Sequence, residues 1–418
     1  MTTLILNRFN LARVRYPDWC REDEDLVLIT SSDSVSAEKT IRSRQLDGYR
    51  QVVTVENYAD SSVPEFTALD LHEQYGFDRI LAMSEFDILR AARLREAMGL
   101  PGQSYERALL FRDKLLMKDR LRGAGVPVAE YVAVDNATDL RRAADQLGYP
   151  FVLKPRLGAA SIGVSVFHDA DELREFVLRN GLGPADAPAR LLAEAFASND
   201  LFHIDGIVDD GQVRLCWPSE QDSSCLDITQ GMVQISTALE PADPRLGAIQ
   251  NMTRLALEAL EVEEVALFHA EIFSTDSGLV FNEVGCRVGG AKIRDQLEHG
   301  FGVDPIEWFA RAYLDGREPL TIPSRPLRQT GFALVPTRAG VVQDVRPFER
   351  PSSIVVYEPR FAQGDVLTSP GSSAATLASF VSAARTRAQV QADLESAVTA
   401  LECAIDIADT DLTTAGHA

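Results

Sequence analysis

Short apolar runs alternate with polar or amphipathic stretches at the start of the chain. Four runs have the length of buried strands: TLILN (3–7), DLVLIT (25–30), QVVTVEN (51–57) and DRILAM (78–83). The segment 85–98 has the spacing of a helix. Such alternation predicts an open α/β layer. The turn after the first strand, 7–13, lacks the glycines of a dinucleotide fold, so we do not expect NAD to bind there.

A stripe of leucines next predicts one helix over 104–123, closed by Gly123 and the Gly125 and Pro127 that follow. Strand and helix patterns then alternate. Strands are expected at 130–134, 150–155, 163–167 and 189–196, helices at 139–147, 169–179 and 246–260, and a hairpin over 202–218 that turns at 209–211. This middle region contains all the candidate chemistry.

A proline-rich passage predicts a domain boundary near Ile322. Beyond it, strands are expected at 331–337 and 353–359 and a helix near 387–403. The patterns therefore predict a mixed α/β chain whose last region is a separate α+β unit.

Composition narrows the class of protein. With 418 residues, 45% of them hydrophobic and 25% charged, the chain is expected to be a soluble globular protein of two or three domains. No apolar run approaches the roughly 20 residues of a membrane span, and the N-terminus has the pattern of a strand rather than a signal peptide. The five cysteines form no CxxC motif, which indicates free thiols in a reducing cytoplasm. A formal net charge of −21 argues against nucleic acid as a partner.

Two glutamates flank a short turn. Taking 276–278 as a three-residue turn pairs Phe273 with Phe281 and Glu271 with Glu283, and places both carboxylates on one face about 5 Å apart at their β-carbons. Like charges so placed are destabilising unless a cation, a shared proton or a basic side chain intervenes. Magnesium accepts such oxygen ligands, but a salt bridge from Arg287 or Lys292 would serve equally, and the pair alone does not decide between the two.

Lys154 ends an apolar strand and is followed by the loop LGAASIGV (157–164). Gly158 and Gly163 permit unusual dihedral angles, and Ser161 with the loop amides can donate to an anion, although a plain turn between two strands has the same composition. Lys114, on the preceding helix, is either a second phosphate ligand or a lysine that extends along the surface.

Glu194 and Phe196 are candidates for an adenine site, since a carboxylate can accept from the amino group of the base beside an apolar ring. The alternative for Glu194 is a solvated glutamate on an edge strand. His203 reaches a nucleotide sugar or is an ordinary half-buried histidine.

In this order along the chain, Lys114, Lys154, LGAASIGV, LLAEAF, FHAEIF and NEVGCRVGG resemble the ATP-grasp superfamily, in particular its amino-acid and peptide ligases. The resemblance implies a Rossmann-like pre-ATP-grasp domain over 1–103 and an ATP-grasp domain over 104–322. The latter would contain a lid subdomain at about 126–195 and a catalytic subdomain at about 196–322, with an appended α+β subdomain over 323–418.

The resemblance also implies roles for single residues. Lys114 and Lys154 would contact the ATP phosphates under the loop of Gly158, Ser161 and Gly163, and Glu194 and Phe196 would hold the adenine. Glu271 and Glu283 would bind one or two Mg²⁺ ions, or Mn²⁺, and Arg287 would steady an acyl phosphate. Gly289 and Gly290 would leave room for substrate.

Two positions depart from the family pattern. Gly285 stands where an asparagine usually supplies an oxygen to the second metal ion, and Leu201 stands where an acid often binds the ribose, a role that His203 can take instead.

The implied activity is phosphorylation of a small-molecule carboxylate by ATP and attack by an amine, which gives an amide, ADP and phosphate in the cytoplasm. Cys286, beside Arg287, is expected to be structural. Acylation of a carrier thiol or coenzyme A, or a nucleotide-binding scaffold without catalysis, are the alternatives. By analogy with the superfamily, we expect a homodimer.

Overall fold

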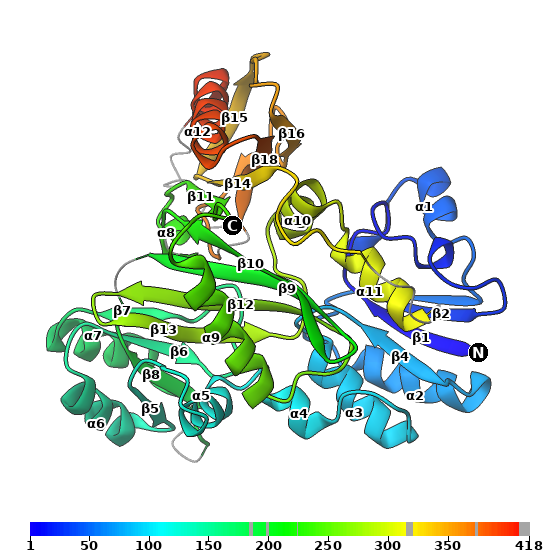
Figure 1. Cartoon of the computed structure of the whole chain (residues 1–418), viewed down its shortest axis with the longest axis horizontal. Coiled ribbons are helices and arrows are strands. Elements are labelled where there is room, and N and C mark those ends of the chain that lie inside the picture. The colour runs from blue at the N-terminus through cyan, green and yellow to red at the C-terminus, as the bar shows by residue number, and fades with distance from the viewer. Residues whose placement is uncertain (184–186, 198–199, 224, 315–320, 373–374, 409–418) are drawn as a thin grey trace, which may run out of the picture.

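The computed structural model describes residues 1–183, 187–197, 200–223, 225–314, 321–372 and 375–408. Figure 1 shows an N-terminal sheet on one side, a small sheet with two helices at the lower left, and the C-terminal strands and helix at the top. The long strands β9, β10 and β12 lie between these parts. Among the described helices, none has the length and apolar character needed to cross a bilayer.

The N-terminal sheet is parallel, as its alternating pattern predicts. Its strands run in the order β3-β2-β1-β4, and their bounds are β1 Thr2–Asn7, β2 Asp25–Ser31, β3 Gln51–Val55 and β4 Arg79–Ala82. The helices are α1 Lys39–Gln45, α2 Val63–Tyr75 and α3 Ile88–Met98. Because the chain leaves β1 toward β2 and β3 and then returns to the other side of β1, the strand order reverses between β1 and β4. In open α/β sheets, ligands bind outside the carboxyl ends of the strands at such a point.

The single helix expected over 104–123 is wrong. The structure has two helices there, α4 Tyr105–Leu110 and α5 Lys114–Gly123. Asp113 separates them because its carboxylate accepts from the amides of Leu115 and Leu116, which is the hydrogen bonding of a helix N-cap. The new helix therefore begins at Lys114.

A small antiparallel sheet follows, within the range predicted for the lid. Its order is β5-β8-β6-β7, with β5 Tyr131–Val134, β6 Phe151–Pro155, β7 Ser165–Phe167 and β8 Leu191–Ala195. Helices α6 Ala137–Leu147 and α7 Ala170–Asn180 pack on it through a core that includes Leu140, Phe151 and Leu173. Residues 126–195 thus contain one layer of strands and one of helices.

The largest sheet is antiparallel and runs in the order β13-β12-β9-β10-β11-β14-β18-β16. Its strands are β9 Leu201–Asp209, β10 Gln212–Gln221, β11 Gln234–Ala238, β12 Ala266–Thr275, β13 Gly278–Gly285, β14 Gln329–Pro336, β16 Ile354–Pro359 and β18 Thr376–Ala384. Since β14 pairs with β11, the sheet continues across the boundary expected near Ile322. The domain limits drawn from sequence stay predictions.

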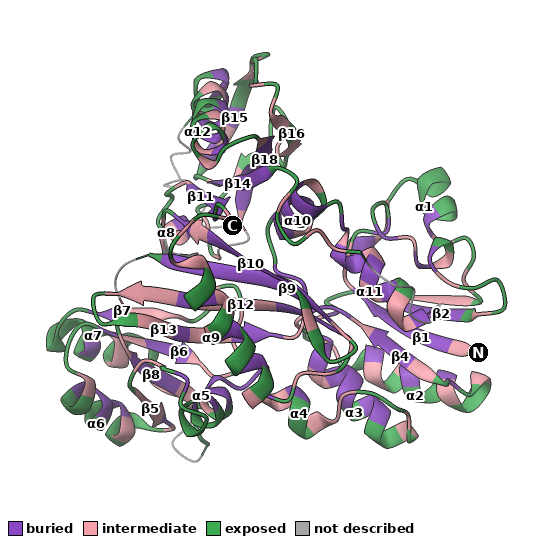
Figure 2. Cartoon of the chain, in the orientation of Figure 1, coloured by how far each residue is buried: buried purple, intermediate pink, exposed green. Residues whose placement is uncertain are grey.

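Helices cover this sheet, and a three-stranded sheet joins it at the C-terminal end. The helices are α8 Cys225–Thr229, α9 Leu246–Ala259, α10 Ile293–Phe301, α11 Pro305–Leu314 and α12 Arg387–Ala404. The small sheet has the order β17-β15-β19, with β15 Gly340–Val345, β17 Val366–Leu367 and β19 Ile405–Ala408. Figure 2 shows buried residues along β9, β10 and β14, and exposed ones on the outer faces of α9 and α12.

Candidate functional site

The β12–β13 hairpin brings Glu271 and Glu283 together, but by a route that differs from the expected one. The turn has two residues, not three, because Thr275 pairs with Gly278 and Phe273 pairs with Val280. The register then shifts by one between Glu271 and Ile272, which restores the predicted pairing of Glu271 with Glu283. The predicted pair is confirmed, and the predicted pairing of Phe273 with Phe281 is wrong.

The register shift inserts Asn282 as the extra residue of a β-bulge, and bulges often redirect a side chain toward a site. The Asn282 amide donates from Nδ2 to Glu271 Oε2 at 2.8 Å and accepts at Oδ1 from Lys154 Nζ at 3.3 Å. Asn282 therefore lies with the two glutamates. Sequence reasoning did not identify it, since nothing in FNEVG indicates an irregular strand.

Three lysines converge on this hairpin. Lys114 Nζ lies 3.2 Å from Glu283 Oε2 and donates to the Gly158 carbonyl at 2.8 Å. Lys118 Nζ lies 3.2 Å from Glu194 Oε1, and Lys154 Nζ lies 2.9 Å from Glu194 Oε2. Lys118 was missed, although its place four residues after Lys114 puts it on the same helix face.

Burial decides between the alternatives that the sequence left open for Lys114, Glu194 and His203. Lys114 is 8% exposed, so it does not extend along the surface. Glu194 is 5% exposed and lies on β8, a central strand of the small sheet, so it is neither on an edge nor solvated. His203 is fully packed rather than half-buried, with 2% exposure.

The charges decide the ionisation of the buried acids. Burial opposes ionisation of Glu283, but Lys114 and Lys154 outweigh it and lower the pKa of that carboxyl. Burial is likewise overcome by Lys118 and Lys154, which lower the pKa of Glu194. Burial lowers the pKa of Lys118, whereas Glu194 and Glu283 overcome burial and raise the pKa of Lys154. Both acids are therefore ionised at neutral pH.

The loop between β6 and β7 curves through left-handed residues. Ala160, Ser161 and Gly163 have φ angles of 54°, 59° and 75°. Gly158, which was expected to need such an angle, does not have one. Instead its α-carbon faces Pro155, and an added β-carbon would lie 3.3 Å from the Pro155 ring. Backbone amides in turn conformations of this kind can form an anion-binding concavity.

Arg287 is held from the N-terminal domain. Its guanidinium donates to Glu85, which also binds Arg112, and to the Val288 carbonyl at 3.0 Å. Burial opposes ionisation of Glu85, but Arg287 and Arg112 lower its pKa. Neither Arg287 nor Lys292 forms an ion pair with Glu271 or Glu283 among the described residues, so the salt bridges considered as alternatives to a metal are wrong.

The structure explains why a glycine suits position 285. A β-carbon at this position would lie 3.1 Å from Glu85 Oε2 and 3.5 Å from the Arg287 side chain. A larger residue would press on the pair that anchors Arg287. The departure from the family pattern thus coincides with the Glu85–Arg287 contact, and Asn282 supplies an amide oxygen nearby.

Behind the acids, Asp205 orients two histidines. It accepts from His203 Nδ1 at 2.6 Å and from His269 Nδ1 at 2.9 Å, while His203 Nε2 contacts Ser236 Oγ at 2.7 Å. Burial opposes the charge on His269, but Asp205 overcomes it and raises its pKa to about 9. His269 Nε2 then lies 3.8 Å from Glu271 Oε1. We interpret this group, the one His/Cys/Asp/Glu cluster of metal-ligating spacing among the described residues, as a hydrogen-bonded support for Glu271.

One cavity of about 1750 Å³ contains the predicted site. It is lined by Lys114, Lys154, Gly158, Ser161, Glu194, Phe196, His203, Glu271, Glu283 and Arg287. Gly163 is not among the lining residues, although its neighbours Ile162 and Val164 are. The volume exceeds the roughly 300–1,000 Å³ typical of a pocket for one small ligand. There is room for a nucleotide and further substrates.

The acid pair fits a hard divalent cation. Glu271 and Glu283 offer carboxylate oxygens from paired strands, and Asn282 offers an amide oxygen between them. Such oxygen ligands suit Mg²⁺ and Mn²⁺. Cys286 does not compete, because burial raises the pKa of its thiol to about 12. This agrees with a structural role for Cys286.

Parts of the sequence are similar to a known family model and to known proteins. Residues 119–290 match the family model of the ATP-grasp domain. Over 336 residues, 78% of this chain and 80% of the relative, the sequence is 28% identical to an L-arginine-specific L-amino acid ligase of Bacillus subtilis. A stretch of 99 residues, 24% of this chain and 21% of the relative, is 35% identical to an alanine–anticapsin ligase of Bacillus subtilis strain 168.

The fold is also shared with a solved structure. The crystal structure of an L-amino acid ligase from Bacillus licheniformis aligns with a TM-score of 0.73, at 17% identity, over 98% of this chain and 99% of that chain. At this level of identity the likeness shows the fold.

Proposed function

We propose that this chain, an ATP-grasp protein by its matched domain and its fold, is an ATP-dependent ligase that joins a small carboxylate to an amine, releasing ADP and phosphate. The observation that carries the proposal is the pairing of Glu271 with Glu283, with Lys114 3.2 Å from Glu283, at the wall of a cavity with room for several ligands. The similarity to amino acid ligases favours an amino acid or small peptide as the carboxylate.

Different residues would bind the phosphates, the adenine and the ribose of ATP. Lys114 and Lys154 would neutralise phosphate oxygens under the loop that contains Ser161. Glu194 Oε1 makes no hydrogen bond among the described residues, although Lys118 Nζ lies 3.2 Å from it, so it can accept from the adenine amino group beside Phe196. His203 lines the same cavity and is the candidate for the ribose.

When bound, ATP would supply the phosphoryl group, and Mg²⁺ or Mn²⁺ would supply positive charge next to the phosphate oxygens. Glu271 and Glu283 would hold that ion. Arg287, kept in place by Glu85, would offset the charge of the substrate carboxylate and of the acyl phosphate formed from it. Such a reaction depends on positioning and electrostatic stabilisation, and no covalent enzyme intermediate is required.

The first experiment follows phosphate release from Mg-ATP with a panel of amino-acid pairs. We expect release that depends on both members of a pair. Glu283→Gln keeps the size of the side chain but removes its charge, and should lower turnover by at least about a hundredfold. Glu175→Gln, on the exposed surface of α7, is the matched control and should leave turnover unchanged.

Three results would contradict the proposal. Full activity of the Glu283→Gln variant would remove the metal assignment. Binding of ATP by calorimetry without turnover on any pair would instead favour a nucleotide-binding scaffold, and turnover only with coenzyme A or a carrier thiol would favour the other alternative.

We further propose that the enzyme is a cytoplasmic homodimer. Cys20, Cys216, Cys286 and Cys403 form no disulfide among the described residues, which suits a reducing cytoplasm. Sedimentation analysis would test the homodimer expected by analogy.

A further inference from the structure

Arg8 differs from the other cations at the wall of the cavity. Six lining cations have carboxylate partners: Lys114 with Glu283, Lys154 with Glu194, Arg287 with Glu85, Lys292 and Arg360 with Glu358, and Arg387 with Glu220. Arg8 has none within the described parts of the chain. Its Nε is shielded from solvent and has no hydrogen-bond partner there either.

The position of Arg8 is that of a ligand-binding residue. It follows β1, while Glu85 and Phe86 follow β4, and β1 and β4 are the adjacent strands between which the order of the parallel sheet reverses. The Arg8 guanidinium stacks over the Phe86 ring, with Cζ 4.3 Å from the ring centroid. Phe86 is 45% exposed and lines the cavity.

The backbone on both sides of Arg8 is held in place. The Asn7 side chain donates to the Phe9 carbonyl at 2.9 Å and accepts from the Phe9 amide at 3.1 Å. It also donates to Thr30 Oγ1 at 2.9 Å and accepts from the Tyr16 hydroxyl at 3.0 Å. Arg8 is therefore presented from a fixed backbone, which reduces the entropy lost when it binds an anion.

Two consecutive residues, Glu85 and Phe86, hold Arg287 and Arg8 at the cavity wall. Glu85 binds Arg287, and Phe86, the next residue, supports Arg8. In the proposed reaction, the carboxylate that is phosphorylated lies at Arg287 and the acid pair. The amine that attacks it must enter the same cavity, which Arg8 and Arg287 both line. A carboxylate on the amine substrate would therefore need a cation of that wall that has no carboxylate partner yet.

We propose that Arg8 binds the α-carboxylate of the amine substrate, with Phe86 stacked behind the guanidinium, and that the acceptor is therefore an amino acid. This inference rests on the proposed function. A guanidinium matches a carboxylate with paired hydrogen bonds, which gives orientation as well as charge. Arg8 acts on specificity and takes no part in the transfer of the phosphoryl group.

The test uses Arg8→Gln and two forms of the acceptor, the amino acid that supports wild-type turnover and its carboxamide. With the amino acid, loss of a charge-assisted pair should raise the acceptor KM by roughly ten- to hundredfold. With the carboxamide, wild type and variant should have the same KM. Arg8→Lys keeps the charge and should recover part of the loss, while KM for ATP stays unchanged.

Arg21→Gln, which removes an exposed arginine from the same domain, is the control and should behave as wild type with both acceptors. The proposal is overturned if Arg8→Gln leaves the amino-acid KM unchanged, raises the KM of both acceptors equally, or acts on the KM of the phosphorylated substrate instead.

Failure of the proposed function is a separate result, since it is decided by wild-type turnover. If wild type releases no phosphate with any pair, calorimetry with Mg-ADP and a panel of L-amino acids and their amides tests Arg8 alone. Binding of acids over amides in wild type but not in Arg8→Gln supports the carboxylate site, and equal binding by both proteins excludes it.

Discussion

Two ends of one cavity treat charge in opposite ways. At the β12–β13 hairpin, buried lysines and carboxylates are already paired with each other. At the carboxyl end of β1, Arg8 has an aromatic ring beside it and no carboxylate partner among the residues that the structure describes. The hairpin therefore holds its geometry without a ligand, whereas the charge of Arg8 is available to pair with a ligand.

Burial explains the difference. Lys118 is 0% exposed, and a charge removed from water in this way requires a partner to remain charged. Arg8 is half-buried at the cavity wall, so its removal from water is only partial. At the β12–β13 hairpin the lysines must therefore be paired with carboxylates when the chain folds. Arg8 can remain charged without such a partner.

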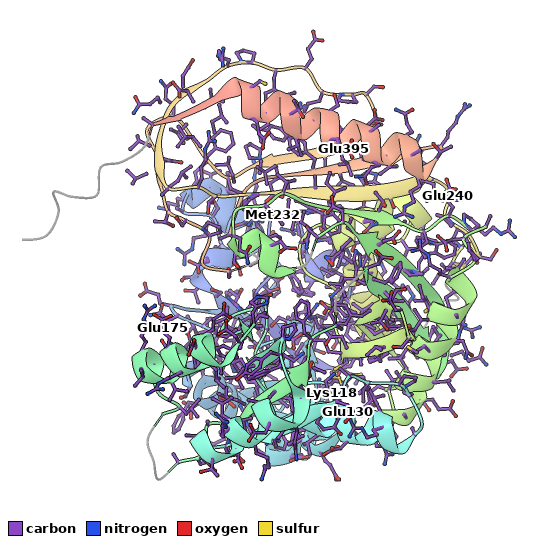
Figure 3. The ribbon with its side chains drawn as sticks, turned by 90° about the vertical axis from the view of Figure 1, so that its left-hand side faces the viewer. Lys118, Glu130, Glu175, Met232, Glu240 and Glu395 are labelled. Carbon is purple, nitrogen blue, oxygen red and sulfur yellow. The ribbon has the colours of Figure 1, made fainter. Side chains whose placement is uncertain are left out.

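The largest effect should come from breaking the paired end. Lys118→Met leaves Glu194 with Lys154 as its remaining cation, and we expect a loss of about 3 kcal/mol in the free energy of unfolding. Denaturant unfolding measures it. In Figure 3 Lys118 lies on the lower half of the molecule among other side chains, whereas Glu175 projects from α7 at its surface.

Lys39→Met, on exposed α1, is the matched control for that substitution and should change stability by no more than about 0.5 kcal/mol. Adding Glu194→Gln to Lys118→Met should restore part of the loss, because the unpaired charge is then gone. Equal stability of the two lysine variants would show that the Lys118 pairing contributes nothing.

A smaller effect should separate Gly289 from Gly290, both of which were expected to leave room for substrate. A β-carbon on Gly289 would meet the end of the Ile293 side chain and would lie 2.7 Å from Asp205 Oδ1 and from His269 Nδ1, so its space is occupied by Ile293 and by the support for Glu271. A β-carbon on Gly290 would meet nothing within 4 Å. Gly289→Ala should cost about 1–3 kcal/mol in thermal or denaturant unfolding, and Gly290→Ala close to nothing.

This pair of variants also tests catalysis. Gly289→Ala should lower turnover because it displaces Asp205 and His269, while Gly290→Ala should affect KM for a substrate if at all. The opposite order of stabilities would contradict the packing at Gly289.

The smallest effect is expected at the unpaired end. Phe86→Leu removes the ring under Arg8 but keeps an apolar side chain, and an exposed cation–π contact contributes about 0.5–1 kcal/mol. The acceptor KM should rise about two- to fivefold, as measured by phosphate release. Phe66→Leu, on an exposed part of α2, should leave it unchanged. A change as large as that of Arg8→Gln would mean that Phe86 contacts the substrate itself.

Much of the fold and of the site could be predicted from local patterns. The four N-terminal strands and the lid strands followed from apolar periodicity. The pairing of Glu271 with Glu283 was predicted from a three-residue turn, whereas in the structure it depends on a two-residue turn and a β-bulge. The helix expected over 104–123 was wrong because a leucine stripe continues through Asp113, and its capping hydrogen bonds do not show in a hydrophobic pattern. That break sets the direction in which Lys114 and Lys118 point.

The sequence by itself determined which residue types are available to the site and in which order the strands that bear them occur, because strand formation and alternation depend on near neighbours. Only the tertiary structure decided the charge partners: Glu85 for Arg287, Glu194 for Lys118, and, in the described part of the chain, no carboxylate for Arg8. These pairs join residues far apart in the chain, so their energy depends on burial and on distances that no local pattern contains. For the same reason Gly285, which in the sequence is only a missing ligand, acquires its explanation from Glu85, two hundred residues before it.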